Sequence, residues 1–151
     1  MAAVEAPVSR YKKQNLLIWI AVLAGLAVWF AYDGYMNEKF IEKHTKEGRP
    51  DHTLIFNRVS PPFLLAGSIV LAGWLMMIRN RKLTATDDSL HTGKAEIPYN
   101  RIESIDKTHF DSKGFFTLSY EENGQKREVK FSDRMYDNLP AVLDRIVEKI
   151  S

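Results

Sequence analysis

Two apolar stretches without a single charged residue dominate the first half of this 151-residue chain, Leu16–Tyr32 and Pro61–Ile78. A helix that crosses a bilayer needs roughly 20 mostly apolar residues at a rise of ~1.5 Å each. With their flanking residues both stretches reach that length, and we expect spans at 15–32 and 61–78. A buried hairpin in a soluble protein is the alternative, but it needs a polar shell that a chain this short does not supply. The pattern predicts a membrane α-helical hairpin.

Aromatic residues mark both ends of the first stretch. Trp19 lies near its start, and Trp29 and Tyr32 lie near its end, which is typical of side chains at the two headgroup levels. A cleaved signal peptide is the competing interpretation of a basic start followed by an apolar run. The run is longer than a usual signal core and ends in bulky aromatic residues, so we expect an anchor that is not cleaved.

Basic residues flank the outer ends of the two spans. Because cations next to spans stay in the cytoplasm, both termini are expected there, with the N-terminal segment 1–14 inside and residues 33–60 outside. We therefore expect an integral protein of a bacterial inner (plasma) membrane. The predicted membrane-interface residues are Arg10, Lys12, Lys13, Trp19, Trp29, Tyr32, Arg79, Arg81 and Lys82.

Small residues recur four positions apart in both spans, as Ala21 with Gly25 and Ser68 with Ala72. Such spacing allows helices to approach closely in lipid, so these are candidate packing positions between the two spans or against a further helix. Neither span contains an ionisable residue. A transport path or proton relay normally places one there, so a transporter or channel is not expected.

The segment between the spans is predicted to be an amphipathic helix and a loop. Met36, Phe40 and His44 recur at helical spacing, so we expect the first helix to continue to Gly48. After a turn, Thr53–Phe56 is predicted to be extended. His44 and His52 lie near several carboxylates, but their spacing does not indicate a metal site.

The tail, residues 79–151, alternates apolar and polar residues and contains several turns. Strands are expected at 82–86, 89–92, 95–99, 102–109, 115–120 and 127–131, and Asn123-Gly124 indicates a tight hairpin. The alternation places Phe116, Leu118 and Tyr120 in a core. Residues 139–150 carry one apolar stripe at helical spacing, with Asp137 or Asn138 as a candidate cap. The tail is thus predicted to be α+β.

This order of elements resembles the bacterial pleckstrin-homology-like domain over roughly residues 81–150, most clearly at Ile97-Pro98-Tyr99 with Ile102 and Ile105. The resemblance implies a partly open antiparallel β-barrel capped by a C-terminal α-helix, directly after two spans. It also implies a binding or assembly module. Many pleckstrin-homology domains bind anionic lipid headgroups through the first hairpin, but the turn here is Asp87-Asp88, which repels phosphate.

The remaining composition narrows the function classes. The net charge is +2 and there is no cysteine, so neither a nucleic-acid footprint nor a thiol site is indicated. No motif for an enzyme, a cofactor or a small-molecule substrate is present. We expect a non-enzymatic accessory or scaffold protein that contacts the lipid bilayer and either other membrane protein subunits or further copies of itself. An anionic-lipid surface-binding module is the alternative.

Overall fold

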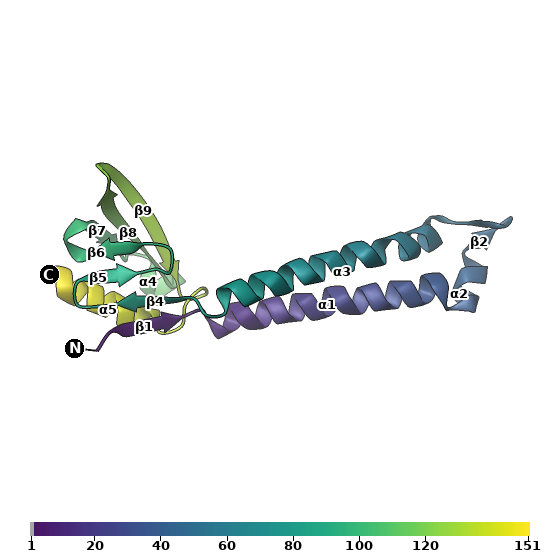
Figure 1. Ribbon diagram of the computed structural model, residues 1–151, viewed down its shortest axis with the longest axis horizontal. Helices are drawn as coiled ribbons and strands as arrows, with labels where there is room; N and C mark the ends of the chain where they lie inside the picture. Colours follow the sequence, from purple (N-terminus) through teal and green to yellow (C-terminus); the bar gives the residue numbers. More distant parts are fainter. Residues whose placement is uncertain (1) are drawn as a thin grey trace. The chain divides into compact units, whose positions relative to one another are not determined.

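The computed structural model describes residues 2–151 and is α+β, with two long apolar helices and open antiparallel sheets (Figure 1). The chain divides into two compact units. One is helical and covers Gln14–Met76. The other combines Met1–Lys13 with Met77–Ser151 and holds the main sheets. The N-terminus is therefore part of the same unit as the tail.

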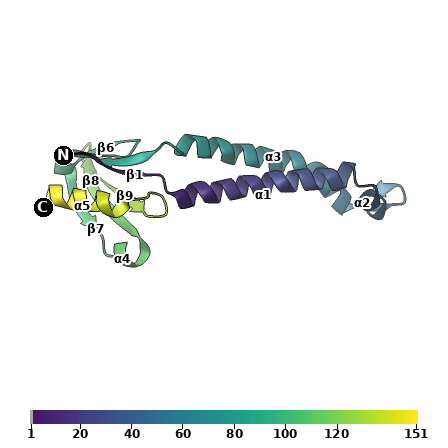
Figure 2. The same cartoon turned by 90° about the horizontal axis from the view of Figure 1, so that it is seen from below.

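The helical unit is built from α1 (Arg10–Tyr35) and α3 (His52–Ile78), which run side by side in both views (Figures 1 and 2). Between them lie α2 (Glu38–Lys43) and the short strands β2 (Thr45–Lys46) and β3 (Arg49–Pro50). One series of less exposed residues recurs at alternating steps of three and four, which is the spacing of the seam in a left-handed helix pair. Its members are Leu16, Ile20, Leu23, Ala27, Phe30 and Gly34 on α1, and Leu54, Asn57, Pro61, Leu64, Ser68, Leu71, Leu75 and Ile78 on α3, with half-buried neighbours such as Ala24 and Ala72 beside it.

Both long helices are long and apolar enough to cross a membrane. Only 11% of the most apolar window of α1 and 17% of that of α3 is buried, whereas the core helix of a soluble protein is mostly buried. Most of their apolar side chains thus face outward. Exposed apolar surface of this extent marks contact with a membrane or with another protein.

The first helix is shorter than the sequence predicts. The expected continuation to Gly48 is wrong, because α1 ends at Tyr35 and a separate helix begins at Glu38. The Asn37 side chain accepts a hydrogen bond from the Phe40 backbone N–H and so starts the new helix.

The second helix begins earlier than the sequence predicts, and the expected extended piece Thr53–Phe56 is helical instead. The Asp51 carboxylate accepts the backbone N–H of Leu54 at 2.9 Å and caps the helix there. Pro61 and Pro62 therefore lie inside α3, where their missing N–H groups leave earlier carbonyls without helical partners. The Arg58 carbonyl is satisfied by the Tyr35 hydroxyl at 3.1 Å.

The sheet unit contains two antiparallel sheets that do not close into a barrel within residues 2–151. One has the order β1-β4-β5-β6 and the other β7-β8-β9. The strands are β1 (Val4–Pro7), β4 (Lys82–Ala85), β5 (Ser89–His91), β6 (Glu96–Pro98), β7 (Ile102–Asp106), β8 (Phe115–Glu122) and β9 (Gln125–Ser132). A 3-10 turn, η1 (Tyr99–Arg101), joins the sheets, and a short helix, α4 (Phe110–Lys113), precedes β8.

The C-terminal helix α5 (Leu139–Ile150) packs on the core of this unit. Phe116 and Leu118 are fully buried as the alternation predicts, whereas Tyr120 is half-buried at the edge of the core. Asn123 and Gly124 both have positive φ, which confirms the predicted hairpin turn.

The strand β1 is absent from the sequence-based prediction. It pairs with β4 in the register Val4↔Ala85 to Pro7↔Lys82, and Ala6 is fully buried. Asn138 is the N-cap residue of α5, which is one of the two positions predicted, but neither its side chain nor that of Asp137 makes a capping hydrogen bond. Both side chains bind the N-terminal segment instead: Asp137 accepts the Arg10 N–H, and Asn138 donates to the Glu5 carbonyl.

Candidate functional site

The strand register gathers several loops at one end of the sheet unit. Pro7 pairs with Lys82, and His91 with Glu96, so the chain leaves β1, enters β4 and turns between β5 and β6 at this end. The segment after β9 joins them, because the Met135 carbonyl accepts the Ser9 N–H. Phe115 pairs with Ser132, which brings α4 to the same place. We call this the basic end, made of residues 7–10, 79–82, 92–95, 107–114 and 133–138.

Cations outnumber carboxylates at the basic end. The cations are Arg10, Arg79, Arg81, Lys82, Lys94, Lys107, Lys113 and Arg134, against Asp111, Asp133 and Asp137. The opposite end carries the turns at Asp87-Asp88 and Asn123-Gly124, the second of them preceded by Glu121-Glu122. The carboxylates there are accompanied by Arg101, Lys126, Arg127 and Lys149, so an excess of positive charge is found at the basic end and, among the described residues, no matching excess of negative charge at the other.

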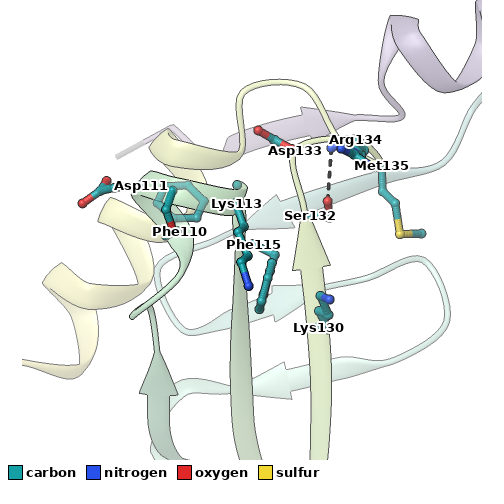
Figure 3. A pocket seen from close by; sticks show the side chains of 11 residues that line it. Phe110, Asp111, Lys113, Phe115, Lys130, Ser132, Asp133, Arg134 and Met135 are labelled. Atoms are coloured by element: carbon teal, nitrogen blue, oxygen red, sulfur yellow. Dashed lines mark hydrogen bonds between the residues drawn. The ribbon is translucent and has the colours of Figure 1, made fainter.

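An open cavity of about 930 Å³ lies at the basic end (Figure 3). It is formed by α4, the start of β8, the end of β9 and the segment that follows β9. Three cations and three large apolar side chains line it. The lining residues include Phe110, Lys113, Phe115, Lys130, Arg134 and Met135, together with Asp111, Ser112, Gly114, Ser132 and Asp133.

Local backbone geometry fixes the wall of this cavity. Gly114 ends α4 in the left-handed conformation with φ of 72°, which favours glycine. Its carbonyl accepts the Asp133 N–H at 2.8 Å, which ties the end of α4 to the segment after β9. The Lys130 ammonium lies 3.8 Å from the centre of the Phe115 ring, a cation–π contact.

The predicted interface residues at the foot of α1 and the start of β4 have structural partners. The Ser9 hydroxyl accepts the Lys12 backbone N–H and caps α1. Arg10 donates its backbone N–H to Asp137, and Lys82 pairs with Glu5. On α1, the Trp19, Trp29 and Tyr32 side chains are exposed.

The candidate packing residues lie in different surroundings. The Ser68 hydroxyl donates to the Ile20 carbonyl at 3.2 Å, which joins α3 to α1. Ala72 is half-buried. Ala21 and Gly25 are exposed, and a Cβ at Gly25 would meet nothing within 4 Å, so they lie outside the contact between α1 and α3.

The acidic turn Asp87-Asp88 carries less free negative charge than the sequence suggests. Asp87 lies 2.7 Å from the buried Arg145 guanidinium and 3.0 Å from the Lys149 ammonium of α5. The hydrogen bond from Lys149 holds the pKa of Asp87 below its usual range. This turn therefore docks α5.

One serine, histidine and glutamate lie together but lack the geometry of a nucleophilic triad. The Ser89 hydroxyl is 2.8 Å from Glu96 and 3.2 Å from Nε2 of His91, and Glu96 approaches the same ring nitrogen at 3.6 Å. In a triad the acid binds the other nitrogen of the ring. Ser89 is also buried, so this cluster joins β5 to β6 rather than exposing a nucleophile.

Sequence reasoning missed the cavity cations Lys113, Lys130 and Arg134. They come from three separate segments, and no spacing along the chain links them. Within residues 2–151, no group of three or more histidine, cysteine or acidic side chains is arranged to hold a metal ion.

No protein-family model, curated protein or solved structure matches this chain.

Proposed function

We propose that this protein is a membrane-anchored, non-enzymatic accessory protein that presents its sheet unit at the cytoplasmic face of a bacterial inner membrane. In this proposal α1 and α3 form a transmembrane hairpin. The observation that carries the proposal is the pairing of β1 with β4, because these strands directly precede α1 and directly follow α3. Two strands of one sheet must lie on the same side of the membrane, which requires an even number of crossings.

Charge supports the cytoplasmic side. The basic end contains both points where the chain joins the long helices, Val8–Arg10 and Arg79–Arg81. Cations at such positions are retained in the cytoplasm, and an anionic leaflet attracts them by about 1 kcal/mol each.

The order of strands supports a pleckstrin-homology-like domain in an altered form. Antiparallel strands are followed by one amphipathic helix, as that resemblance implies. The first strand is β1, so the helical hairpin is inserted between the first two neighbouring strands of the domain. In that family the first hairpin carries the headgroup-binding turn. Counted from β1, the first hairpin is formed by β1 and β4 rather than by the β4–β5 pair with Asp87-Asp88 that the sequence predicts, and the proposed transmembrane hairpin takes the place of its turn.

The described surface supports a binding role rather than catalysis. The Ser89 cluster is not arranged as a triad, and the acidic turn holds α5 in place. Exposed Ala21 and Gly25 offer α1 a small-residue surface for another helix, so the partners we propose are membrane protein subunits or further copies of this chain. The second candidate function is an anionic-lipid surface-binding module, and the observation in its favour is the cluster of cations at the basic end.

Topology is tested directly because the chain contains no cysteine. Single Glu42→Cys and Ser151→Cys variants are labelled in intact cells with a membrane-impermeable maleimide. We expect the Glu42→Cys variant to be labelled in intact cells. The Ser151→Cys variant should be labelled only after the cells are lysed. Equal labelling of both positions in intact cells would reject the hairpin.

Assembly is tested by crosslinking the full chain in native membranes, followed by purification in mild detergent and mass spectrometry. Recovery of a defined partner or oligomer supports the accessory role. Recovery of monomer alone, with no crosslinked species, contradicts it. A matched variant, Gly25→Leu, is expected to weaken the complex, while Gly73→Leu, equally open on α3, serves as the control.

A further inference from the structure

Three cations that line the basic cavity have no carboxylate partner in the described part of the chain. Among residues 2–151, Lys113, Lys130 and Arg134 are in no ion pair, although Asp111 and Asp133 line the same cavity. Some other cations of this unit pair with carboxylates: Lys82 with Glu5, Lys126 with Glu103, Arg127 with Glu122, and Lys149 with Asp87. Within the same described range, Lys94, Arg101 and Lys107 resemble the cavity cations in having no ion pair, but they do not line the cavity. The cavity therefore retains positive charge that the fold does not neutralise.

Among the described residues, neither carboxylate lies within ion-pairing distance of these cations. Asp133 is packed against the backbone of Gly114, at the place where a Cβ would otherwise lie. In Figure 3, Asp111 lies on the far side of Phe110 from Lys130. Lys130 instead stacks on the Phe115 ring, which holds its ammonium at the cavity wall without neutralising it.

Apolar side chains stand beside the cations. Met135 is exposed to 40%, and Phe110 and Phe115 are half-buried at the same wall. A cavity that combines several unpaired cations with exposed apolar surface fits an anion that carries an organic body. A bare inorganic ion makes no use of the apolar wall.

The cavity also lies next to the start of α1. Met135 accepts the Ser9 N–H at 2.9 Å, and Asp137 binds Arg10 at 3.0 Å. The segment that supplies Arg134 is therefore attached to the first turn of that helix. If α1 spans the membrane as proposed above, this segment stands at the headgroup level.

From these observations we propose that the cavity binds a phosphate ester of net negative charge through Lys113, Lys130 and Arg134, with Phe115 and Met135 against its organic part. Two sources carry this chemistry, the headgroup of an anionic phospholipid and a small soluble phosphate ester. The lipid source rests on the proposed function, and the soluble source does not.

The test uses the full chain in a neutral detergent and follows its thermal unfolding midpoint as ligand is added. The probes are short-chain phosphatidylglycerol, short-chain phosphatidylcholine and glycerol 3-phosphate. We expect saturable stabilisation by phosphatidylglycerol or glycerol 3-phosphate and none by phosphatidylcholine. Stabilisation by phosphatidylglycerol alone identifies the lipid source, and equal affinity for both phosphate esters identifies the soluble one.

Matched variants assign the binding to the cavity. Lys130→Gln with Arg134→Gln removes two cavity cations, and Lys126→Gln with Arg127→Gln removes two cations from the other end of β9. Because this variant loses two charged donors to the phosphate, it is expected to bind roughly tenfold more weakly or worse. The control variant is expected to bind like the parent.

Equal weakening in both variants, or no stabilisation by either phosphate ester, would overturn the proposal. All four side chains are exposed, so the unliganded midpoints should agree and show that both variants fold. Carbonate extraction of cell membranes is run in parallel. This extraction reports only on whether the protein is integrated in the membrane. Failure of the proposed membrane anchor is therefore distinguished from failure of the proposed ligand binding.

Discussion

Pro7 at the end of β1 pairs with Lys82 at the start of β4, and beyond them the Val8 N–H donates to the Arg81 carbonyl at 3.1 Å. The chain thus leaves the sheet and returns to it at neighbouring positions. The long helices occupy the place of a hairpin turn between two strands. The sheet unit should therefore not depend on them for its own fold.

Replacing Ser9–Asn80 by Asn-Gly is expected to give a soluble, folded domain. The remaining flanking pair, Val8 and Arg81, already has the hydrogen bond of a two-residue hairpin, and Asn-Gly favours the turn that fits strand twist. Circular dichroism should show mixed α and β content with one cooperative thermal transition.

The control for this variant is the fragment 79–151, which lacks β1. Without β1 the edge of β4 is unpaired, and the core loses the fully buried Ala6. We expect a lower unfolding midpoint and concentration-dependent aggregation. Equal midpoints for the two proteins would show that β1 does not belong to the folded unit.

Gly34→Ala is expected to destabilise the helical unit, because its Cβ would lie 2.9 Å from the Asn57 carbonyl oxygen of α3. Overpacking of this kind costs about 1–3 kcal/mol. Gly25→Ala is the matched control, since its Cβ meets nothing within 4 Å and Ala favours the helix by up to about 1 kcal/mol. The measurement is the thermal midpoint in detergent, and a higher midpoint for Gly34→Ala than for Gly25→Ala would contradict the close contact.

Sequence patterns predicted the features that depend on residues close together in the chain. Alternation placed Phe116 and Leu118 in the core, and Asn123-Gly124 marked its turn, because both signals lie within a few residues. The strand β1 was missed because four residues, Val4–Pro7, carry little alternation and their partner is distant in the sequence.

The start of α3 and the cavity were missed for a similar reason. A Pro-Pro pair such as Pro61-Pro62 is typical of a first helical turn. In the structure the helix is capped by Asp51, ten residues before Pro61, and the Tyr35 hydroxyl of α1 donates to the Arg58 carbonyl, which the prolines leave without a helical partner. The cavity combines Lys113 and Arg134 from separate segments that only the folded chain brings together.

Gly114→Ala is expected to destabilise the sheet unit and to disturb the cavity. Any side chain at φ of 72° is strained, and a Cβ there would also clash with the Asp133 carboxylate. Gly93→Ala is the control, because its φ of 78° imposes the same strain with nothing within 4 Å. The difference between the two midpoints isolates the Asp133 contact, and we expect Gly114→Ala to be the less stable. A smaller loss for Gly114→Ala would show that Asp133 moves aside freely.

Acid should loosen the turn that joins the two long helices through Asp51. The Leu54 backbone N–H and the His44 ring, 2.9 Å away, hold the pKa of Asp51 below its ordinary value of 3.8. A carboxyl whose pKa is lower in the folded state stabilises that state above its unfolded pKa, and this contribution is lost as the pH falls through the folded pKa.

The variant Asp51→Asn tests this contribution, because it keeps an acceptor for the Leu54 N–H but removes the charge. Relative to the parent, its thermal midpoint in detergent is expected to be lower between about pH 4 and pH 6, and the difference should shrink as the pH falls below that range. Glu42→Gln, an exposed carboxylate on α2, should show no such pH-dependent difference. A difference for Asp51→Asn that is the same at pH 3 and pH 6 would mean that the charge of Asp51 does not stabilise the turn.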